Sequence, residues 1–552
     1  MKRPFRGAFL SWAVGTLMMA IFVVWSDAQA GDNIRPVEPA STFVNQAIHK
    51  KLTQAKVPCS AVADDAEFLR RVYLDLTGRI PTLEQAVRFL DSKDADKRRK
   101  LVDELLASPN FGKHFANVWT TLIYSGDIDP PQNVKQAELT AWLATQFNAG
   151  RGWDKIVQDL ITAEGNAPQA IFTIINGDNG KPGANKLAGA SSKLFLGVQL
   201  QCAECHNHPF AKWKQKEFWG MAAFFGQVQN GGAAKKGKGT GGVAESTSAV
   251  KAAKKGAAIA TQGPGTIVIP NTAGKLVGAV VKARYLEGAE PTLPTGPLRP
   301  TLAKWMTAPE NPFFAKASAN RLWYQMFGRG LVQPVDDMHE ENACSHPEVL
   351  DKLAQEFKAS GFDVKHLLRV ICNSEPYQRT SKPLPGNKDD DDHYARMNVK
   401  AFTPDMLYDS LCVAMSTNDI NVATGRQPTT GRQKGTAKGG NPRERFVKFF
   451  STRDDNTMLT EYTDGIPQIL AMLNTEQLNK GGGTVDQIVK AKTPEPKAIE
   501  TLFLATLSRR PTTEDMAIMT KYLSTRQSQP AAERYSGMLW ILINTSEFTL
   551  NH

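Results

Sequence analysis

Residues 81–90 read Pro-Thr-Leu-Glu-Gln-Ala-Val-Arg-Phe-Leu, and this stretch indicates the fold class. Thr82 and Gln85 form the capping-box pattern that begins a helix directly behind a proline. The apolar residues that follow, in this stretch and again over residues 101–106, recur at helical spacing. The stretch therefore predicts short helices that pack through one apolar face.

The same helical period recurs over most of the chain, and it predicts a mainly α protein with two helical regions. The first region ends where a segment rich in Lys, Gly and Ala begins, which predicts a flexible basic linker. Two β-branched runs, at 266–269 and 276–285, then predict a small β-hairpin before a proline-rich connector. The predicted divisions are a lead-in at 31–63, a cytochrome c-like helical domain at 64–228, the linker at 229–265, the hairpin and connector at 266–297 and a helical C-terminal domain at 298–552.

Two helix starts are predicted in the C-terminal domain. Asn311 followed by Pro312 is typical of a capped helix with proline in its first turn. Ser345 and Glu348 have the spacing of a capping box, which predicts a helix that Ser345 caps.

The first 30 residues have the pattern of a secretory signal peptide. Lys2, Arg3 and Arg6 precede an apolar run at 8–25, and Ala28-Gln29-Ala30 is a small-x-small cleavage site. We therefore expect an exported protein, periplasmic or at the cell surface. An uncleaved membrane anchor is the alternative for the same segment.

The 552-residue chain has a formal net charge of +11, and the distribution of this charge bears on its partners. The excess of Lys and Arg gathers in two polar, Gly-rich segments, 229–265 and 425–440. Because the rest of the chain after the signal segment is close to neutral, we expect no nucleic-acid groove. Apart from the signal segment, no stretch has the length and apolar character of a membrane span.

Cys202-Ala203-Glu204-Cys205-His206 carries the chemistry that the sequence indicates most clearly. Cys-x-x-Cys-His is the attachment pattern of c-type haem. Two thiols add to the two vinyl groups of one porphyrin, and the adjacent imidazole becomes the proximal ligand of the iron. The motif predicts haem c held by Cys202 and Cys205, with His206 on the iron.

Two other structures compete with haem at this motif. His208 could complete a zinc knot with Cys202, Cys205 and His206, although adjacent residues rarely bind one tetrahedral ion together. A disulfide or plain structural loop is the second alternative. The remaining cysteines, Cys59, Cys344, Cys372 and Cys412, allow two disulfides in three pairings.

A one-haem electron carrier usually needs a second axial ligand, often Met or His. Met221 is the nearest candidate along the chain, and His114 and His346 are more distant ones. A buried core methionine is the competing interpretation of Met221. The polar cluster at 336–346 could hold a divalent metal, but it lacks the His-Glu-x-x-His spacing, and a solvated loop is the alternative.

Part of the chain consists of blocks that match a known sequence pattern. These blocks are 70–78, 105–109, 195–213, 311–315, 327–330, 334–337, 345–348, 507–512 and 542–552. Together they resemble an exported planctomycete family, whose members join two uncharacterised domains, of which the first is named planctomycete cytochrome C-like. The resemblance implies export and a two-domain, mostly helical protein, but no reaction, and it covers most of the chain outside the basic linker. One departure is Ala211, where the family often has Asp.

The sequence favours a mono-haem c-type protein of the cell envelope that transfers electrons or senses redox state. The alternative is a haem-free envelope scaffold, binding module or hydrolase in which the motif is a metal or disulfide knot. The sequence does not identify a redox partner, a substrate or an envelope component that the protein binds. It also does not decide whether the protein is an enzyme.

Overall fold

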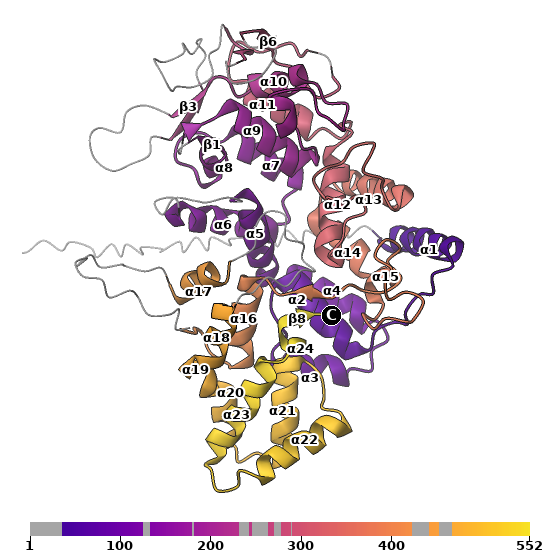
Figure 1. The fold of residues 1–552 in the computed structure, drawn as a ribbon, viewed down its shortest axis with the longest axis vertical. Coiled ribbons are helices and arrows are strands. Elements are labelled where there is room, and N and C mark those ends of the chain that lie inside the picture. Colours follow the sequence, from indigo (N-terminus) through magenta and orange to yellow (C-terminus); the bar gives the residue numbers. More distant parts are fainter. Residues whose placement is uncertain are drawn as a thin grey trace, which may run out of the picture. The chain divides into compact units, whose positions relative to one another are not determined.

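The computed structural model describes residues 36–124, 133–178, 181–230, 242–245, 263–269, 278–288, 290–421, 441–451 and 466–552. The predicted signal segment, most of the basic linker and all of 425–440 lie outside these residues. Within them the protein is mainly helical, as predicted, with short two-stranded antiparallel sheets (Figure 1). No helix in the described part of the chain is long and apolar enough to cross a bilayer.

The N-terminal half contains ten α-helices among its described residues. They are α1 (Glu38–Ala55), α2 (Asp65–Thr77), α3 (Leu83–Asp91), α4 (Lys97–Ala107), α5 (Pro109–Ile123), α6 (Asn133–Asn148), α7 (Trp153–Thr162), α8 (Ile171–Ile175), α9 (Ala184–Ser191) and α10 (Gln215–Ala223). Three short helical turns join them at Pro168–Ala170, Ser192–Leu196 and Gln201–Glu204. The predicted capping box is confirmed, because the side chains of Thr82 and Gln85 each accept a hydrogen bond from the other residue's backbone N–H.

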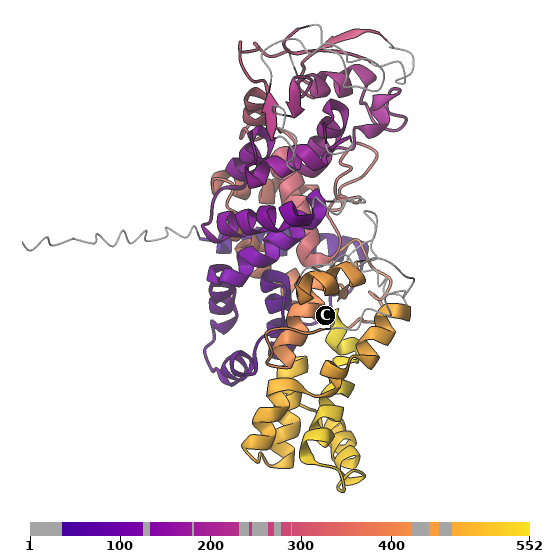
Figure 2. The same ribbon diagram turned by 90° about the vertical axis from the view of Figure 1, so that its left-hand side faces the viewer.

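The C-terminal half continues with helices of similar length. They are α11 (Arg299–Met306), α12 (Phe314–Phe327), α13 (Pro347–Ala359), α14 (Val364–Cys372), α15 (Glu375–Gln378), α16 (Pro404–Ala414), α17 (Pro442–Phe450), α18 (Ile466–Asn474), α19 (Glu476–Asn479), α20 (Gly482–Lys490), α21 (Glu495–Leu507), α22 (Thr513–Ser524), α23 (Ala531–Ile543) and α24 (Ser546–Thr549). Helices α21, α22 and α23 gather at one end, drawn in yellow in Figure 2.

The two predicted helix starts differ from the structure in detail. Asn311 accepts hydrogen bonds from the backbone N–H groups of Phe313 and Phe314, at 2.9 and 3.0 Å. However, Phe313 occupies the N-cap position of α12, and the helix begins two residues beyond Pro312, so the proline is not in its first turn. The capping box at Ser345 is wrong. His346 occupies the N-cap position of α13, and the Ser345 hydroxyl lies 3.1 Å from the His346 ring instead.

In the described segments, four antiparallel strand pairs accompany the helices. The predicted hairpin is confirmed as β5 (Thr266–Val268) paired with β6 (Val280–Lys282). In the described part of the predicted linker, β4 (Val243–Glu245) is an ordered strand, and its Glu245 carboxylate is buried against the Arg299 guanidinium at 2.8 Å. The other pairs are β1 (Gly177–Asp178) with β2 (Lys181–Pro182), β3 (Val228–Asn230) with β4 (Val243–Glu245), and β7 (Lys400–Ala401) with β8 (Leu550–Asn551).

The hydrophobic core does not divide between the two predicted domains. Residues 36–552 form one compact unit, and its main core cluster contains residues from Val37 to Met397 and also Leu504. Helix α2 contributes Phe68 and Val72 to this cluster and Leu74 to the second cluster, which the C-terminal helices form. Helix α2 therefore packs into both clusters. Burying each of these side chains stabilises the fold by about 1.5–3 kcal/mol.

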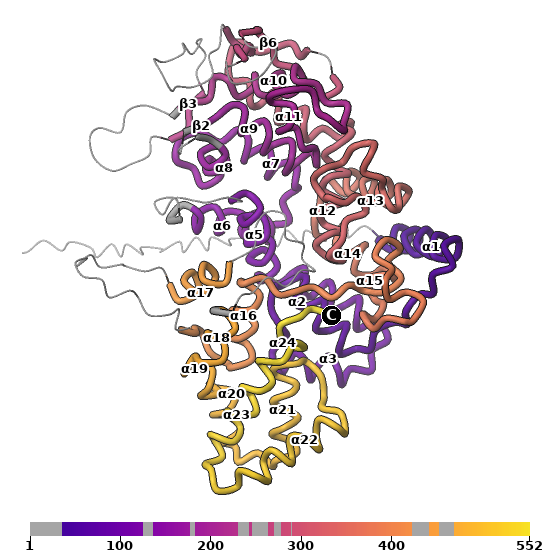
Figure 3. Tube along the Cα trace, in the orientation of Figure 1, coloured from indigo at the N-terminus to yellow at the C-terminus, as the bar shows by residue number. Residues whose placement is uncertain are grey.

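Helix α2 also carries buried charges that bind the C-terminal half. The Arg70 guanidinium donates to the carbonyls of Thr506 and Phe548 at 3.0 and 2.7 Å. The Arg71 guanidinium donates to the carbonyls of Tyr377 and Arg379 at 2.7 and 2.9 Å. The end of the chain therefore lies beside α2, where β8 contacts that helix (Figure 3).

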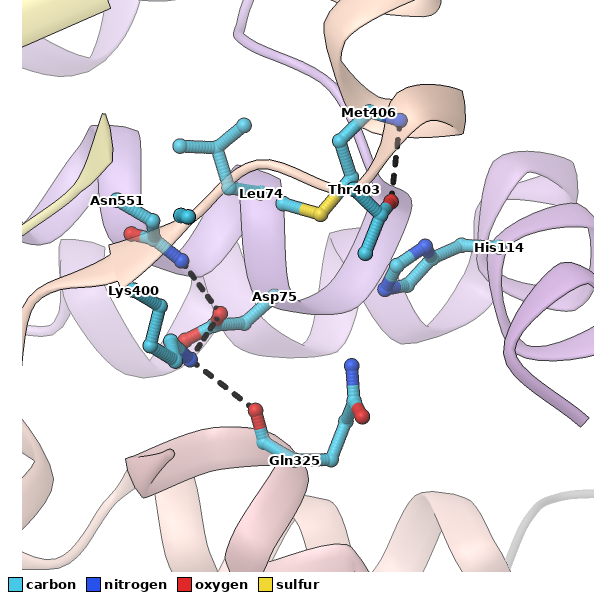
Figure 4. A pocket seen from close by; sticks show the side chains of 9 residues that line it. Leu74, Asp75, His114, Gln325, Lys400, Thr403, Met406 and Asn551 are labelled. Atoms are coloured by element: carbon cyan, nitrogen blue, oxygen red, sulfur yellow. Dashed lines mark hydrogen bonds and ion pairs between the residues drawn. The ribbon is translucent and has the colours of Figure 1, made fainter. Parts of the chain in front are cut away.

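Asp75 is the centre of this junction (Figure 4). Its carboxylate accepts from Lys400 Nζ and Asn551 Nδ2, each at 2.6 Å, and from the Tyr377 hydroxyl at 2.8 Å. Lys400 also donates to the Met326 carbonyl at 2.6 Å. Each oxygen of Asp75 thus has a donor, which a carboxylate buried in a protein interior requires.

Candidate haem-attachment site

The Cys-x-x-Cys-His motif lies on a short 3₁₀ turn, Gln201–Glu204, and the residues just after it. Cys202, Cys205 and His206 are exposed, whereas Ala203 is buried and anchors the turn. Both motif thiols are unpaired, as are the other four cysteines. The structure therefore places the two thiols and the imidazole at the surface, with neither sulfur used in a disulfide.

Helix α10 holds this turn in place. The Glu204 carbonyl accepts from Gln215 Nε2 and from Trp219 Nε1, both at 3.0 Å. The Asn207 side chain accepts from the Gln215 backbone N–H at 3.0 Å, so the chain is bound on both sides of His206. Gln215 and Trp219 are buried, which shields these hydrogen bonds from water. Sequence analysis missed both residues, because nothing in their spacing links them to the motif.

The His206 ring has the orientation that a metal-bound imidazole needs. Its Nδ1 lies 2.7 Å from the Asn207 carbonyl oxygen. A carbonyl oxygen only accepts, so in the neutral ring Nδ1 carries the proton and Nε2 keeps its lone pair. Histidines that bind metals through one ring nitrogen usually donate the other N–H to a carbonyl or carboxylate. His206 therefore fits the proximal ligand of an iron atom.

His208 has the opposite arrangement. Its Nδ1 accepts from the backbone N–H groups of Phe210 and Ala211, at 3.3 and 2.8 Å, so in the neutral ring the proton is on Nε2. Burial lowers the pKa of His208; the Asp337 carboxylate opposes this effect, and the neighbouring His339 and His206 rings add to it. Ala211 contributes through its backbone, so the lack of Asp at this position leaves the hydrogen bond intact. As oriented, the His208 ring offers no free lone pair to a metal ion.

The candidate distal ligands are not gathered around His206. Met221 is fully buried in α10, within the main core. His114 is buried at the Asp75 junction, and His346 is buried at the start of α13. A thioether inside the core cannot reach an iron bound to an exposed imidazole without unpacking that core.

The polar cluster at 336–346 lies against the motif-bearing half of the chain. Asp336 accepts from Gln199 Nε2 at 3.1 Å, and the Met338 backbone N–H donates to the Gly197 carbonyl at 2.7 Å. The His339 ring is 6.2 Å from the His208 ring. Among the described residues, no group of three or more His, Cys, Asp or Glu side chains is arranged to hold a metal ion.

The site and the fold define a mainly helical protein with an exposed Cys-x-x-Cys-His turn. Comparison with protein families adds two matches. Residues 43–230 match a protein of unknown function named PSCyt2 (DUF1549), and residues 298–523 match one named PSD1 (DUF1553). The chain therefore carries these two family domains in this order, as the sequence resemblance predicts. No curated protein and no solved structure matches the chain.

Proposed function

We propose that this protein is an exported mono-haem c-type protein that transfers electrons or senses redox state in the cell envelope. One observation carries the proposal: two exposed, unpaired thiols share a buttressed turn with an imidazole whose Nε2 is free. The name PSCyt2 of the matching family is in agreement with it. Export rests on the signal-peptide pattern of residues 1–30.

Each residue of the motif has a definite part in attachment. The Cys202 and Cys205 thiols would hold the haem by adding across its two vinyl groups, each S–H bond being replaced by an S–C bond with the hydrogen on the adjacent carbon and no net exchange of electrons. His206 would hold the iron through Nε2, with its Nδ1–H donated to the Asn207 carbonyl. A bound haem iron supplies one-electron chemistry between its two oxidation states.

A zinc knot at this motif would lose hydrogen bonds that haem attachment leaves in place. A knot needs His208 to turn its ring away from two backbone N–H groups, which would leave those groups without their acceptor. The structure therefore favours haem over zinc at this motif.

The test is peroxidase staining for haem on a denaturing gel, after expression in a host that matures c-type cytochromes. We expect the wild-type band to stain and the Cys202→Ala/Cys205→Ala variant to be colourless. Cys59→Ala is the matched control, because Cys59 is also exposed and unpaired but lies outside the motif, and it should stain like wild type. A colourless wild-type band in a host whose own cytochromes stain would overturn the proposal.

A further inference from the structure

A cleft of about 460 Å³ lies beside the motif turn. One wall comes from the N-terminal half, at Phe210–Trp213, and the other from the C-terminal half, at Pro312, Phe313 and residues 338–351. This volume is within the range of small-molecule sites, about 300–1,000 Å³. None of Cys202, Cys205 and His206 lines the cleft.

The walls of the cleft are aromatic and apolar. Phe210 has 68% of its side chain exposed, which is unusual for a phenylalanine. Trp213 packs edge-on against Phe313, with ring centroids 6.0 Å apart. The Lys212 ammonium lies 5.5 Å from the centre of the Trp213 ring, so this ring already faces one cation. Trp213 itself is buried, so the exposed Phe210 ring is the apolar surface that a ligand would cover and thereby stabilise.

The rim of the cleft is acidic. Glu287, Glu340, Glu341 and Asp351 line it, against the two lysines Lys212 and Lys316. Both lysines are paired with rim acids: Lys212 with Glu287 and, at 3.6 Å, with Glu340, and Lys316 with Asp351 at 2.6 Å. The acids exceed the lysines by two, so the rim carries a net negative charge. Such a rim attracts cations and disfavours anions, including the carboxylates of a porphyrin.

We propose that this cleft binds an organic cation with an aromatic or apolar body. The apolar part covers Phe210 and Phe313, and the positive charge lies among the rim carboxylates and over an aromatic face. Aromatic walls with nearby carboxylates are a general solution for quaternary ammonium groups. Both halves of the chain contribute a wall, so the site exists only in the assembled unit.

The experiment titrates phenyltrimethylammonium into the full chain by isothermal calorimetry, with benzenesulfonate as the anionic probe of similar size. We expect saturable binding of the cation, weakened by salt, and no binding of the anion. Glu340→Gln/Glu341→Gln should weaken binding by about threefold to tenfold, the usual range for two exposed charges. Phe210→Ala should weaken it by at least as much.

Glu533→Gln is the control, because Glu533 is an exposed glutamate on α23, outside the cleft lining. It should bind the cation like wild type. Repeating the titration with Cys202→Ala/Cys205→Ala separates this proposal from haem binding, since the cleft should bind the cation whether or not haem is attached. Equal binding of both probes, no binding of the cation, or affinities unchanged by the cleft variants would overturn the proposal.

Discussion

Replacing Asp75 by Asn should destabilise the whole unit. In the native protein the Asp75 carboxylate is 3% exposed and receives Lys400 Nζ at 2.6 Å, while the Lys400 side chain is 5% exposed. Asparagine keeps the size of the side chain but removes the charge that compensates the buried ammonium. Breaking one side of a buried ion pair costs about 3–5 kcal/mol. We expect a decrease of that size in the free energy of unfolding at pH 7.

The pH dependence of this loss identifies its cause. Burial lowers the pKa of Lys400, and the Asp75 carboxylate opposes that effect. Without the carboxylate, the pKa of Lys400 in the folded state falls further below its value in the unfolded chain, about 10.4. A lowered lysine pKa means that the folded state favours the neutral amine. The penalty is therefore full at neutral pH and declines as pH rises towards 10.

Urea unfolding followed by tryptophan fluorescence would measure both effects. Arg88→Ala is a matched control, because it breaks a 2.5 Å ion pair with Glu104 whose side chains are 62% and 50% exposed. It should cost less than about 1 kcal/mol. The double variant Asp75→Asn/Lys400→Met should be more stable than Asp75→Asn alone, since it removes the unpaired charge. If Asp75→Asn lies within about 1 kcal/mol of wild type, or the double variant is less stable than Asp75→Asn, the reasoning is wrong.

Two further predictions concern His114 and Trp219. Burial lowers the pKa of His114 to about 4, and its Nε2 has no hydrogen-bond partner among the described residues. Since this folded pKa lies below the unfolded value of about 6.5, stability is full above pH 6.5 and declines between pH 6.5 and 4. Thermal unfolding across this range should show the decline, and His114→Gln should flatten it; an equally steep decline in the variant would contradict the assignment. Trp219→Phe removes the indole hydrogen bond to the Glu204 carbonyl, which should destabilise the motif turn by about 1 kcal/mol and lower haem content per protein, whereas Trp142→Phe should leave haem content unchanged.

Local patterns in the sequence were sufficient for most of the secondary structure. The capping box at Thr82 and the paired strands at 266–268 and 280–282 depend on neighbouring residues, and both are present in the structure. Ser345 shows the limit of such patterns. It has the spacing of a capping box, but its hydroxyl is beside the His346 ring and the helix begins after His346. Spacing alone does not determine which of two adjacent residues becomes the N-cap.

The candidate site was predictable only in part. The motif identifies Cys202, Cys205 and His206, because the chemistry of attachment fixes their spacing. Met221 was chosen as a distal candidate for its nearness along the chain, yet it is fully buried in the core. The tautomer of His206 and the hydrogen bonds from α10 depend on contacts between side chains and backbone that no sequence pattern encodes.

The buried charges of α2 show why the two family domains occur in one compact unit. Arg70 and Arg71 each donate to main-chain carbonyls of the C-terminal half, hundreds of residues away in sequence. Burial lowers the pKa of Arg70 to about 10, so both guanidinium groups remain charged at neutral pH. Among the described residues, the Arg70 guanidinium donates only to carbonyls of the C-terminal half, and leaving this charge without partners has a large cost. Arg71 is also paired with Glu67 on α2, at 2.6 Å. The motif and the cleft beside it therefore belong to an assembly of both halves, in which the second domain is a structural requirement of the first.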